Sequence, residues 1–146
     1  MLLPACITGG GTPRALYPNP ETPRPPGEVA RLSGPVATVD DRDVAKLGKS
    51  FALLPGCHVV KLAAKTGETS STGSGGYVTN LPSTIYAFRM RAQHSYDIDV
   101  RFDGSGGATV GQVTIRAWDH DANGAAVEVA PVAADAEIDA CLKWTP

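Results

Sequence analysis

Apolar and polar residues alternate in short stretches along most of the chain, and clusters of glycine, proline, asparagine, aspartate and serine separate these stretches. Tyr86, Phe88 and Met90 share one side of such a stretch, for example. A period of two residues is typical of β-strands that bury one face. The candidate strands cover residues 28–32, 36–39, 50–54, 57–62, 84–90, 96–102, 112–118, 126–129 and 138–144.

The alternating pattern predicts an all-β fold, because no long stretch carries the 3.6-residue period of a helix. Short strands with turns throughout favour a single antiparallel β-sandwich of about seven strands over residues 27–146. The segment 66–76 is rich in glycine, serine and threonine and has little to bury. We expect this segment to be a flexible excursion from the sheets.

The N-terminal part, residues 1–26, differs in composition from the rest. Three consecutive glycines and six prolines between residues 13 and 26 predict a disordered, extended tether. Ahead of them, Leu3-Pro4-Ala5-Cys6 resembles the lipobox in which a bacterial lipoprotein cysteine is acylated. A basic region and an apolar core of 7–15 residues would normally precede such a motif. Cys6 is therefore expected to be lipidated at the end of a truncated signal peptide, unless the short match is accidental.

Cys57 and Cys141 remain as a pair once Cys6 is assigned to lipidation. An even number of remaining cysteines suits an oxidising compartment, in which the two would form a disulfide. Two free, partly buried thiols are the alternative. The sequence favours the disulfide.

Length and charge narrow the classes of function. The chain has 146 residues, enough for one domain, and a net charge of −2 without a run of Lys or Arg. Nucleic-acid binding needs a basic surface, so we expect no nucleic-acid partner. Because no apolar stretch reaches the roughly 20 residues of a spanning helix, contact with a membrane is expected through the lipid anchor only.

The segment from Asp119 to Gly124 begins like a calcium-binding loop. Asp119, Asp121 and Asn123 alternate as oxygen ligands do in the first half of an EF-hand loop. The twelfth position should supply a bidentate carboxylate, but Ala130 stands there. We therefore interpret the segment as the tip of a β-hairpin and keep a weak Ca²⁺ site as the alternative.

Three histidines could in principle form an acid–base or metal site. His58 alternates with buried positions, whereas His94 and His120 lie at turns, so we expect them to be structural. The sequence lacks a nucleophile elbow and a Cys-x-x-Cys pair. The chain is therefore predicted not to be an enzyme and to need no cofactor. Trp118 falls on the polar side of its strand, where an exposed ring would suit a partner or glycan.

Residues 17–62 resemble a set of small bacterial envelope lipoproteins. The likeness rests on Tyr17, on the run from Pro23 to Leu32, and on Leu53-Leu54-Pro55-Gly56-Cys57-His58-Val59-Val60, which is similar to a hairpin of PEGA-like β-sandwich domains. The resemblance implies a PEGA/Ig-like fold and the periplasmic or cell-surface side of a bacterial membrane. We expect a structural or interaction module for an envelope protein or cell-wall partner. The alternative is a small ligand- or Ca²⁺-binding domain that uses residues 119–124.

Overall fold

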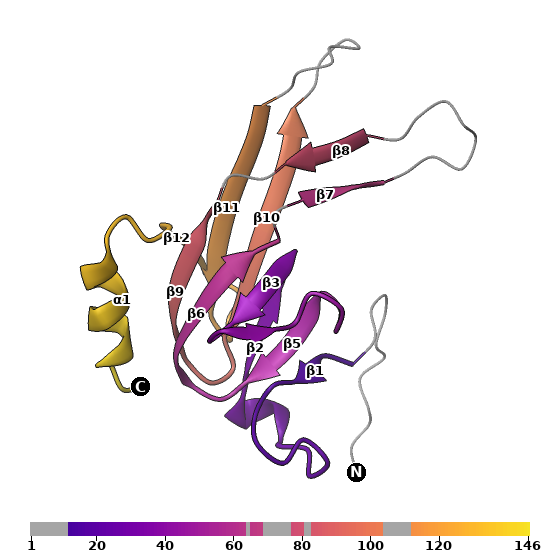
Figure 1. Ribbon diagram of the computed structural model, residues 1–146. Helices are drawn as coiled ribbons and strands as arrows, with labels where there is room; N and C mark the ends of the chain where they lie inside the picture. The colour runs from indigo at the N-terminus through magenta and orange to yellow at the C-terminus, as the bar shows by residue number, and fades with distance from the viewer. Residues whose placement is uncertain (1–11, 64, 69–76, 81–82, 104–111) are drawn as a thin grey trace.

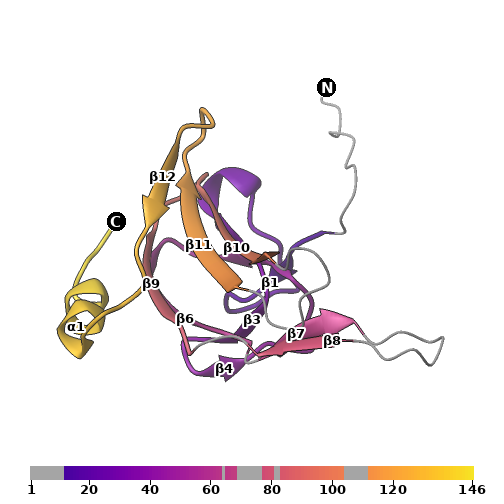
Figure 2. The same ribbon diagram turned by 90° about the horizontal axis from the view of Figure 1, so that it is seen from above.

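The computed structural model describes residues 12–63, 65–68, 77–80, 83–103 and 112–146. These residues form two main sheets that face each other, a separate two-stranded ribbon and one short α-helix (Figure 1, Figure 2). The prediction of a mainly β fold with two layers is confirmed. The described residues contain twelve strands, more than the seven expected, because several strands are only two to four residues long.

The first sheet has six strands and mixed direction. The prediction of a purely antiparallel sandwich is wrong, since β1 pairs with β5 and β2 pairs with β10 in parallel. Both parallel pairs join strands that are distant in sequence, which a local pattern does not reveal. The strand order is β1 (Arg14–Ala15), β5 (Ser50–Leu53), β2 (Ala30–Ser33), β10 (Ser95–Asp103), β11 (Gln112–His120) and β12 (Ala126–Val129).

The second sheet is antiparallel and has four strands in the order β4 (Arg42–Asp43), β3 (Val36–Val39), β6 (Gly56–Leu62) and β9 (Ile85–Met90). A two-stranded ribbon, β7 (Lys65–Glu68) with β8 (Tyr77–Asn80), stands apart from both sheets (Figure 1). The expectation of an unstructured excursion over 66–76 is wrong for residues 66–68, which pair with the second strand of the ribbon. Residues 69–76 lie outside the described part.

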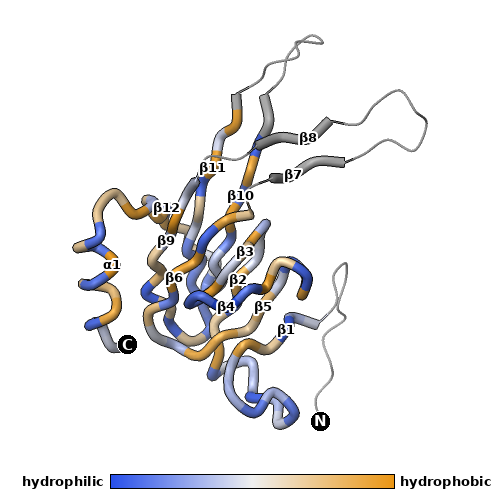
Figure 3. The backbone as a smooth tube through the Cα atoms, viewed as in Figure 1, coloured by the Kyte–Doolittle hydropathy of each residue, from blue (hydrophilic) through white to orange (hydrophobic). Residues whose placement is uncertain are grey.

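The core lies between the two main sheets and is built from the alternating residues. Aromatic rings connect the layers: Phe88 stacks on Tyr86 within β9, and its centroid lies 5.4 Å from that of Tyr96 on β10. Figure 3 shows hydrophobic stretches on the strands and mainly hydrophilic colour on the loop between β1 and β2. The buried core side chains include Leu32, Phe51, Leu53, Ile98 and Ala117 from the first sheet and Val36, Val39, Val60 and Met90 from the second.

Tyr96 fixes the corner at which the chain passes from β9 in one sheet to β10 in the other. Its hydroxyl accepts a hydrogen bond from the Arg91 amide at 2.8 Å and donates to the Arg89 carbonyl at 3.2 Å. Burial raises the pKa of Tyr96 to about 12, so the hydroxyl keeps the proton that it donates. The buried hydroxyl is tolerated here because it both accepts and donates a hydrogen bond.

The C-terminal segment forms a helix, α1 (Asp135–Leu142), where period-two alternation predicted a strand over 138–144. Ile138, Cys141 and Leu142 also fit the spacing i, i+3, i+4 of a helix face. The Glu137 carboxylate accepts hydrogen bonds from the Ala133 and Ala134 amides, which lowers its pKa and closes the first turn. Alanines and acidic residues near the N-terminus then favour the helix.

Residues 12–26 have a defined conformation, so the prediction of a disordered tether is wrong for them; Leu16 and Tyr17 pack on the sandwich, whereas residues 18–26 are exposed. β1 pairs with β5, and the Leu16 amide donates to the Ala52 carbonyl at 2.9 Å. Tyr17 is only 8% exposed. A short 3₁₀ helix, Pro26–Glu28, leads into β2. Residues 1–11, with Cys6, lie outside the described part.

Candidate functional site

The proline-rich segment between β1 and β2 is a closed loop on the surface of the sandwich. Its base is Tyr17, whose hydroxyl accepts a hydrogen bond from the Arg24 amide at 3.1 Å. The Arg24 guanidinium also lies 5.9 Å from the centre of the Tyr17 ring, within range of a cation–π contact. Between them, the Thr22 amide donates to the Asn19 carbonyl at 3.0 Å. These bonds bring together the ends of a compact loop, a kind of surface loop that is frequently functional.

Proline makes this loop rigid. Pro18, Pro20, Pro23 and Pro25 fix their own backbone angles and also restrict the residue before each of them. Asn19, which precedes Pro20, has a φ of +58°, a left-handed conformation that asparagine tolerates better than most residues. The conformational entropy of the free loop is therefore small, and a ligand would find its surface already arranged.

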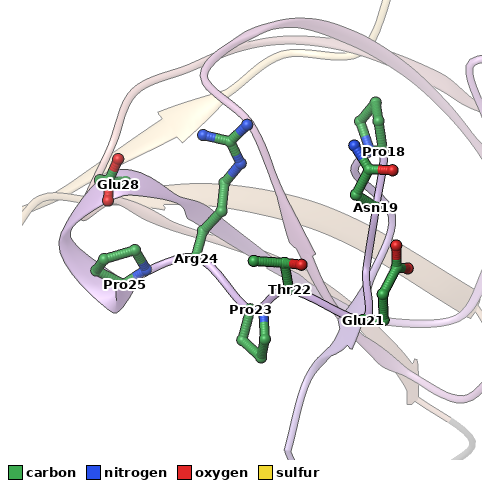
Figure 4. Close-up of a pocket in the computed structure, with 8 residues that line it drawn as sticks. All are labelled: Pro18, Asn19, Glu21, Thr22, Pro23, Arg24, Pro25 and Glu28. Carbon is green, nitrogen blue, oxygen red and sulfur yellow. The ribbon is translucent and has the colours of Figure 1, made fainter.

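Two hollows border the loop, one on each side, and both are lined by Glu21 and Pro23. The first has a volume of about 460 Å³; Figure 4 shows that its polar groups come from Asn19, Glu21, Thr22, Arg24 and Glu28, with prolines between them. The second has a volume of about 550 Å³. Its lining includes Tyr17 and prolines as walls, with the polar or charged residues Thr12, Arg14, Glu21 and Arg42.

The lining of both hollows suits binding. Guanidinium, carboxylate, amide and hydroxyl groups surround rigid proline rings, so charged and hydrogen-bonding groups of a ligand would find partners of either sign. Sequence reasoning missed this site because it interpreted the prolines as a tether. The sequence signal for a folded segment was the short apolar run Ala15-Leu16-Tyr17, because a solvated tether would not be expected to contain such a run.

The tip from Asp119 to Gly124 is a hydrogen-bonded turn between β11 and β12, as the hairpin interpretation predicted. One carboxylate oxygen of Asp121 accepts hydrogen bonds from the Asn123 and Ala125 amides, at 2.8 and 3.0 Å. Asp119 lies within β11 and binds His94 Nδ1 at 2.6 Å. The two carboxylates that would start a calcium loop are thus engaged in holding the turn and the strand end.

Each of the three histidines contacts an aspartate. His94 binds Asp119, and His120 Nε2 lies 2.9 Å from Asp97 on the neighbouring strand. These two pairs occupy opposite faces of the β10–β11 ladder, since Tyr96 is aligned with Asp119 and Ser95 with His120. His58 belongs to the other sheet. In the described ranges, no three His, Cys, Asp or Glu side chains are grouped so that they could hold a metal ion.

His58 of β6 connects the turn between β3 and β4 with the segment between β5 and β6. Its Nδ1 lies 2.6 Å from an Asp40 carboxylate oxygen, and its Nε2 lies 2.7 Å from the Leu54 carbonyl oxygen. Neither partner can donate a proton when Asp40 is ionised, so the arrangement favours the protonated imidazole, in which both ring nitrogens are donors. The other Asp40 oxygen accepts from the Val59 amide at 2.8 Å.

The pKa of His58 is raised above its usual value of 6.5. Partial burial of the ring is the largest single influence and acts in the opposite direction, because it favours the neutral form. The hydrogen bonds to Asp40 and Leu54, together with the charge of Asp40, outweigh it. The hydrogen bonds of His58 to Asp40 and Leu54 thus stabilise its protonated form.

Cys57 and Cys141 form the predicted disulfide, with Cα atoms 5.5 Å apart. Cys57 lies in β6, and Cys141 is the buried residue of α1. The bond attaches the helix to the outer face of the four-stranded sheet, where α1 packs against β6 and β9 (Figure 1). Beyond the helix, Trp144 lies against Arg91 at 5.2 Å.

Trp118 lies on the outer face of the six-stranded sheet, as its position in the pattern indicated. The Arg116 guanidinium covers the ring at 4.8 Å and forms a two-bond ion pair with Glu128. This pairing raises the pKa of Arg116 and lowers that of Glu128. With Arg116 against the ring, the indole surface is less open to a stacking ligand than the sequence suggested.

Two further findings concern the membrane and relatives. In the part of the chain that the structure covers, no helix is both long and apolar enough to cross a bilayer. Comparisons with protein-family models, with curated proteins and with solved structures found no match to this chain.

Proposed function

We propose that this chain is a non-catalytic binding module of the bacterial cell envelope, anchored by a lipid on Cys6. In this proposal its partner is an envelope protein or cell-wall material, and the partner binds at the hollows of the loop between β1 and β2. The observation that carries the proposal is this loop: a rigid surface with charged groups, closed by Tyr17 and Arg24 and packed on the sandwich through Tyr17. A preformed surface of this kind loses little conformational entropy when a partner binds it.

The disulfide supports the proposal that the protein is exported to an oxidising compartment. Disulfides persist in oxidising compartments such as the periplasm and are rare where thiol reductants act. Cys57 and Cys141 are bonded, and they join segments 84 residues apart in sequence. A bond that closes so long a loop stabilises the folded state by about 4–5 kcal/mol on the chain-entropy estimate. A stabilising contribution of this size depends on the chain being kept oxidised.

The sandwich supports the likeness to PEGA/Ig-like domains. Two sheets pack face to face, and Tyr96 closes the corner between them through its hydroxyl. In immunoglobulin-like domains a tyrosine near the start of a strand makes the same kind of bond to backbone a few residues upstream. Such domains commonly serve as interaction modules on exported proteins.

The non-catalytic part of the proposal rests on what the candidate side chains do. His58, His94 and His120 each contact an aspartate that belongs to a neighbouring strand or turn. His58 is held between two acceptors, an arrangement that stabilises its proton and opposes transfer. All three therefore serve the fold.

Folding of residues 12–26 changes the reach of the anchored domain. If Cys6 carries the lipid, only six residue steps separate it from Thr12, the first described residue. Even a fully extended chain covers at most about 20 Å in six steps, at 3.3–3.6 Å per residue. The loop and its hollows would then lie close to the membrane surface, within reach of membrane-bound partners.

The anchor is tested by expressing the protein from its native gene in its bacterial host. The expected mature protein begins at Cys6, carries acyl chains by mass spectrometry and sediments with membranes. A Cys6→Ser variant should be unacylated and should not sediment with them. Mature wild-type protein that keeps residues upstream of an unmodified Cys6 contradicts the lipid anchor.

The binding surface is tested by site-specific photo-crosslinking in the same host. A photoreactive residue at Thr22, which lines the first hollow, should give a discrete crosslinked product with an envelope component. The same residue at Thr114, exposed on the outer face of β11, serves as the matched control. Equal products from both positions, or none from Thr22, would contradict binding at the first hollow.

A further inference from the structure

The second hollow lies where the edges of the two main sheets approach each other. β1 is the edge strand of the six-stranded sheet, and β4 is the edge strand of the four-stranded sheet. Arg14 of β1 and Arg42 of β4 both line the hollow of about 550 Å³. One ligand in this hollow would therefore contact both layers of the sandwich.

Strand register places both arginines on the core side of their sheets. Arg14 is aligned with Phe51 of β5, and Arg42 is aligned with Val39 of β3. Phe51 and Val39 are buried between the sheets, and aligned residues of paired strands project to the same face. Both arginines are nevertheless exposed, so they reach solvent from opposite layers at the edge of the sandwich.

Neither arginine has a carboxylate partner in the part of the chain that the structure describes. The ion pairs found there use Arg101 and Arg116 but not Arg14 or Arg42. Glu21 lines the same hollow without pairing to either of them. The charged lining thus has two cations and one anion, with a net charge of +1.

The remaining walls of the hollow are rigid. Tyr17, Pro13, Pro20 and Pro23 border the hollow. Pro20 and Pro23 are exposed and Tyr17 is buried, so the hollow is open to solvent, and its rigid walls reduce the entropy lost on binding. A guanidinium presents paired donors that match the two oxygens of a carboxylate.

We propose that this hollow binds the terminal carboxylate of a short peptide between Arg14 and Arg42. A single negative charge neutralises the net charge of the lining, whereas a phosphate dianion would leave the occupied hollow with a net charge of −1. Glu21 instead suits an amide N–H or an ammonium group of the same ligand. The volume is within the usual range of small-ligand sites, about 300–1,000 Å³. This inference rests on the proposed binding function and names the ligand class.

The test is an NMR titration of the oxidised full chain that follows the Nε–H signals of its arginines. The probes are L-alanyl-L-alanine, its C-terminal amide, D-alanyl-D-alanine and inorganic phosphate. The acid form of either dipeptide should shift Arg14 and Arg42, and the amide should not. Preference for the L or D form distinguishes a protein C-terminus from a cell-wall peptide as the source of the carboxylate.

Charge-neutral variants provide the second arm. Arg14→Gln and Arg42→Gln should each weaken dipeptide binding roughly tenfold or more, because a charge-assisted pair is lost. Arg31→Gln is the matched control, because Arg31 is exposed on β2 and its substitution removes the same charge outside the hollow. Equal weakening by Arg31→Gln would reveal a general charge effect and overturn the assignment.

Other results would also overturn it: an amide that binds as well as the acid, phosphate that binds as tightly with the same arginine dependence, or no shift at either arginine. Such a failure is separable from failure of the proposed function. A crosslinked product at Thr22 without dipeptide binding would reject only the ligand class, whereas the absence of both would reject the binding loop.

Discussion

Gly34 stands at the tightest backbone contact among the glycines of the described residues. Its φ is +142°, and a β-carbon built there would lie 2.9 Å from both the β-carbon and the carbonyl oxygen of Ile98. Gly56 has a nearly equal φ of +138° but no atom within 4 Å of the same position. The two sites therefore share backbone strain and differ in crowding.

We expect Gly34→Ala to destabilise the fold more than Gly56→Ala does, by about 1–3 kcal/mol, the usual cost of overpacking. Because the φ values match, the difference isolates the contact with Ile98. The free energy of unfolding in urea measures it for both variants. Equal losses would show that strain at positive φ, and not the close approach of β10, explains the effect.

The raised pKa of His58 predicts how stability changes with pH. A folded-state pKa above the unfolded value of 6.5 means that the folded protein binds the proton more tightly. The stabilisation is complete below pH 6.5 and is lost as the pH rises through the folded pKa. The free energy of unfolding should therefore decline over that interval.

His58→Gln should remove this decline, because glutamine does not titrate. The measurement is a series of urea unfolding curves from about pH 5 to about pH 9, which bracket histidine titration. His120→Gln is the control, since His120 contacts Asp97 across the other sheet. A decline that persists in His58→Gln and disappears in His120→Gln would contradict the role given to His58.

Residues whose roles depend on local pattern were predictable, and those whose roles depend on distant partners were not. The sequence indicated that His58 alternates with buried residues, and its side chain is only 16% exposed. It could not show Asp40, 18 residues away, as the partner of the ring. Nor could it place Arg14 near Arg42, because their strands belong to different sheets.

At the scale of elements, α1 is held chiefly by one covalent bond. Among its residues, Cys141 is the buried one, at 2% exposure, whereas Leu142 is 59% exposed. A helix of eight residues is too short to be stable on its own. Its structure therefore depends on the attachment to β6.

We expect Cys141→Ser to release the helix and to lower the stability of the protein by about 2–5 kcal/mol. Amide hydrogen exchange over residues 135–142 should become fast, and so should exchange in the wild type after reduction with dithiothreitol. Leu142→Ala is the control within the same helix and should change stability by less than about 0.5 kcal/mol. A helix that stays protected after reduction would show that Ile138 and Trp144 suffice to hold it.

Two of the errors at the scale of elements have one physical origin. In the C-terminal segment, the apolar positions fit both a period of two and a helical face. The helix is favoured because the Glu137 carboxylate accepts hydrogen bonds from the two amides that precede it. In the N-terminal segment, prolines suggested a tether, yet Tyr17 buries its ring and anchors the loop. Local composition is a weak guide where one tertiary contact decides the outcome.

At the scale of the whole molecule, the two-layer β fold and the Cys57–Cys141 bond could be predicted from the sequence. Periodicity sets which residues face the core, and the parity of the cysteines indicated the pairing. The parallel contacts of β1 and β2 could not be predicted, because they bring together strands without a shared turn. The contact of β1 with β5 attaches the start of the N-terminal segment to the six-stranded sheet.

The account depends most on the N-terminal loop being part of the folded domain and not a tether. Amide hydrogen exchange of the oxidised full chain, followed by NMR, tests this most directly at Leu16 and Arg24. Their amides donate to the Ala52 carbonyl and the Tyr17 hydroxyl, so we expect both to exchange slowly, with Leu16 comparable to strand residues. Exchange at both positions as fast as in an unfolded peptide would contradict the account.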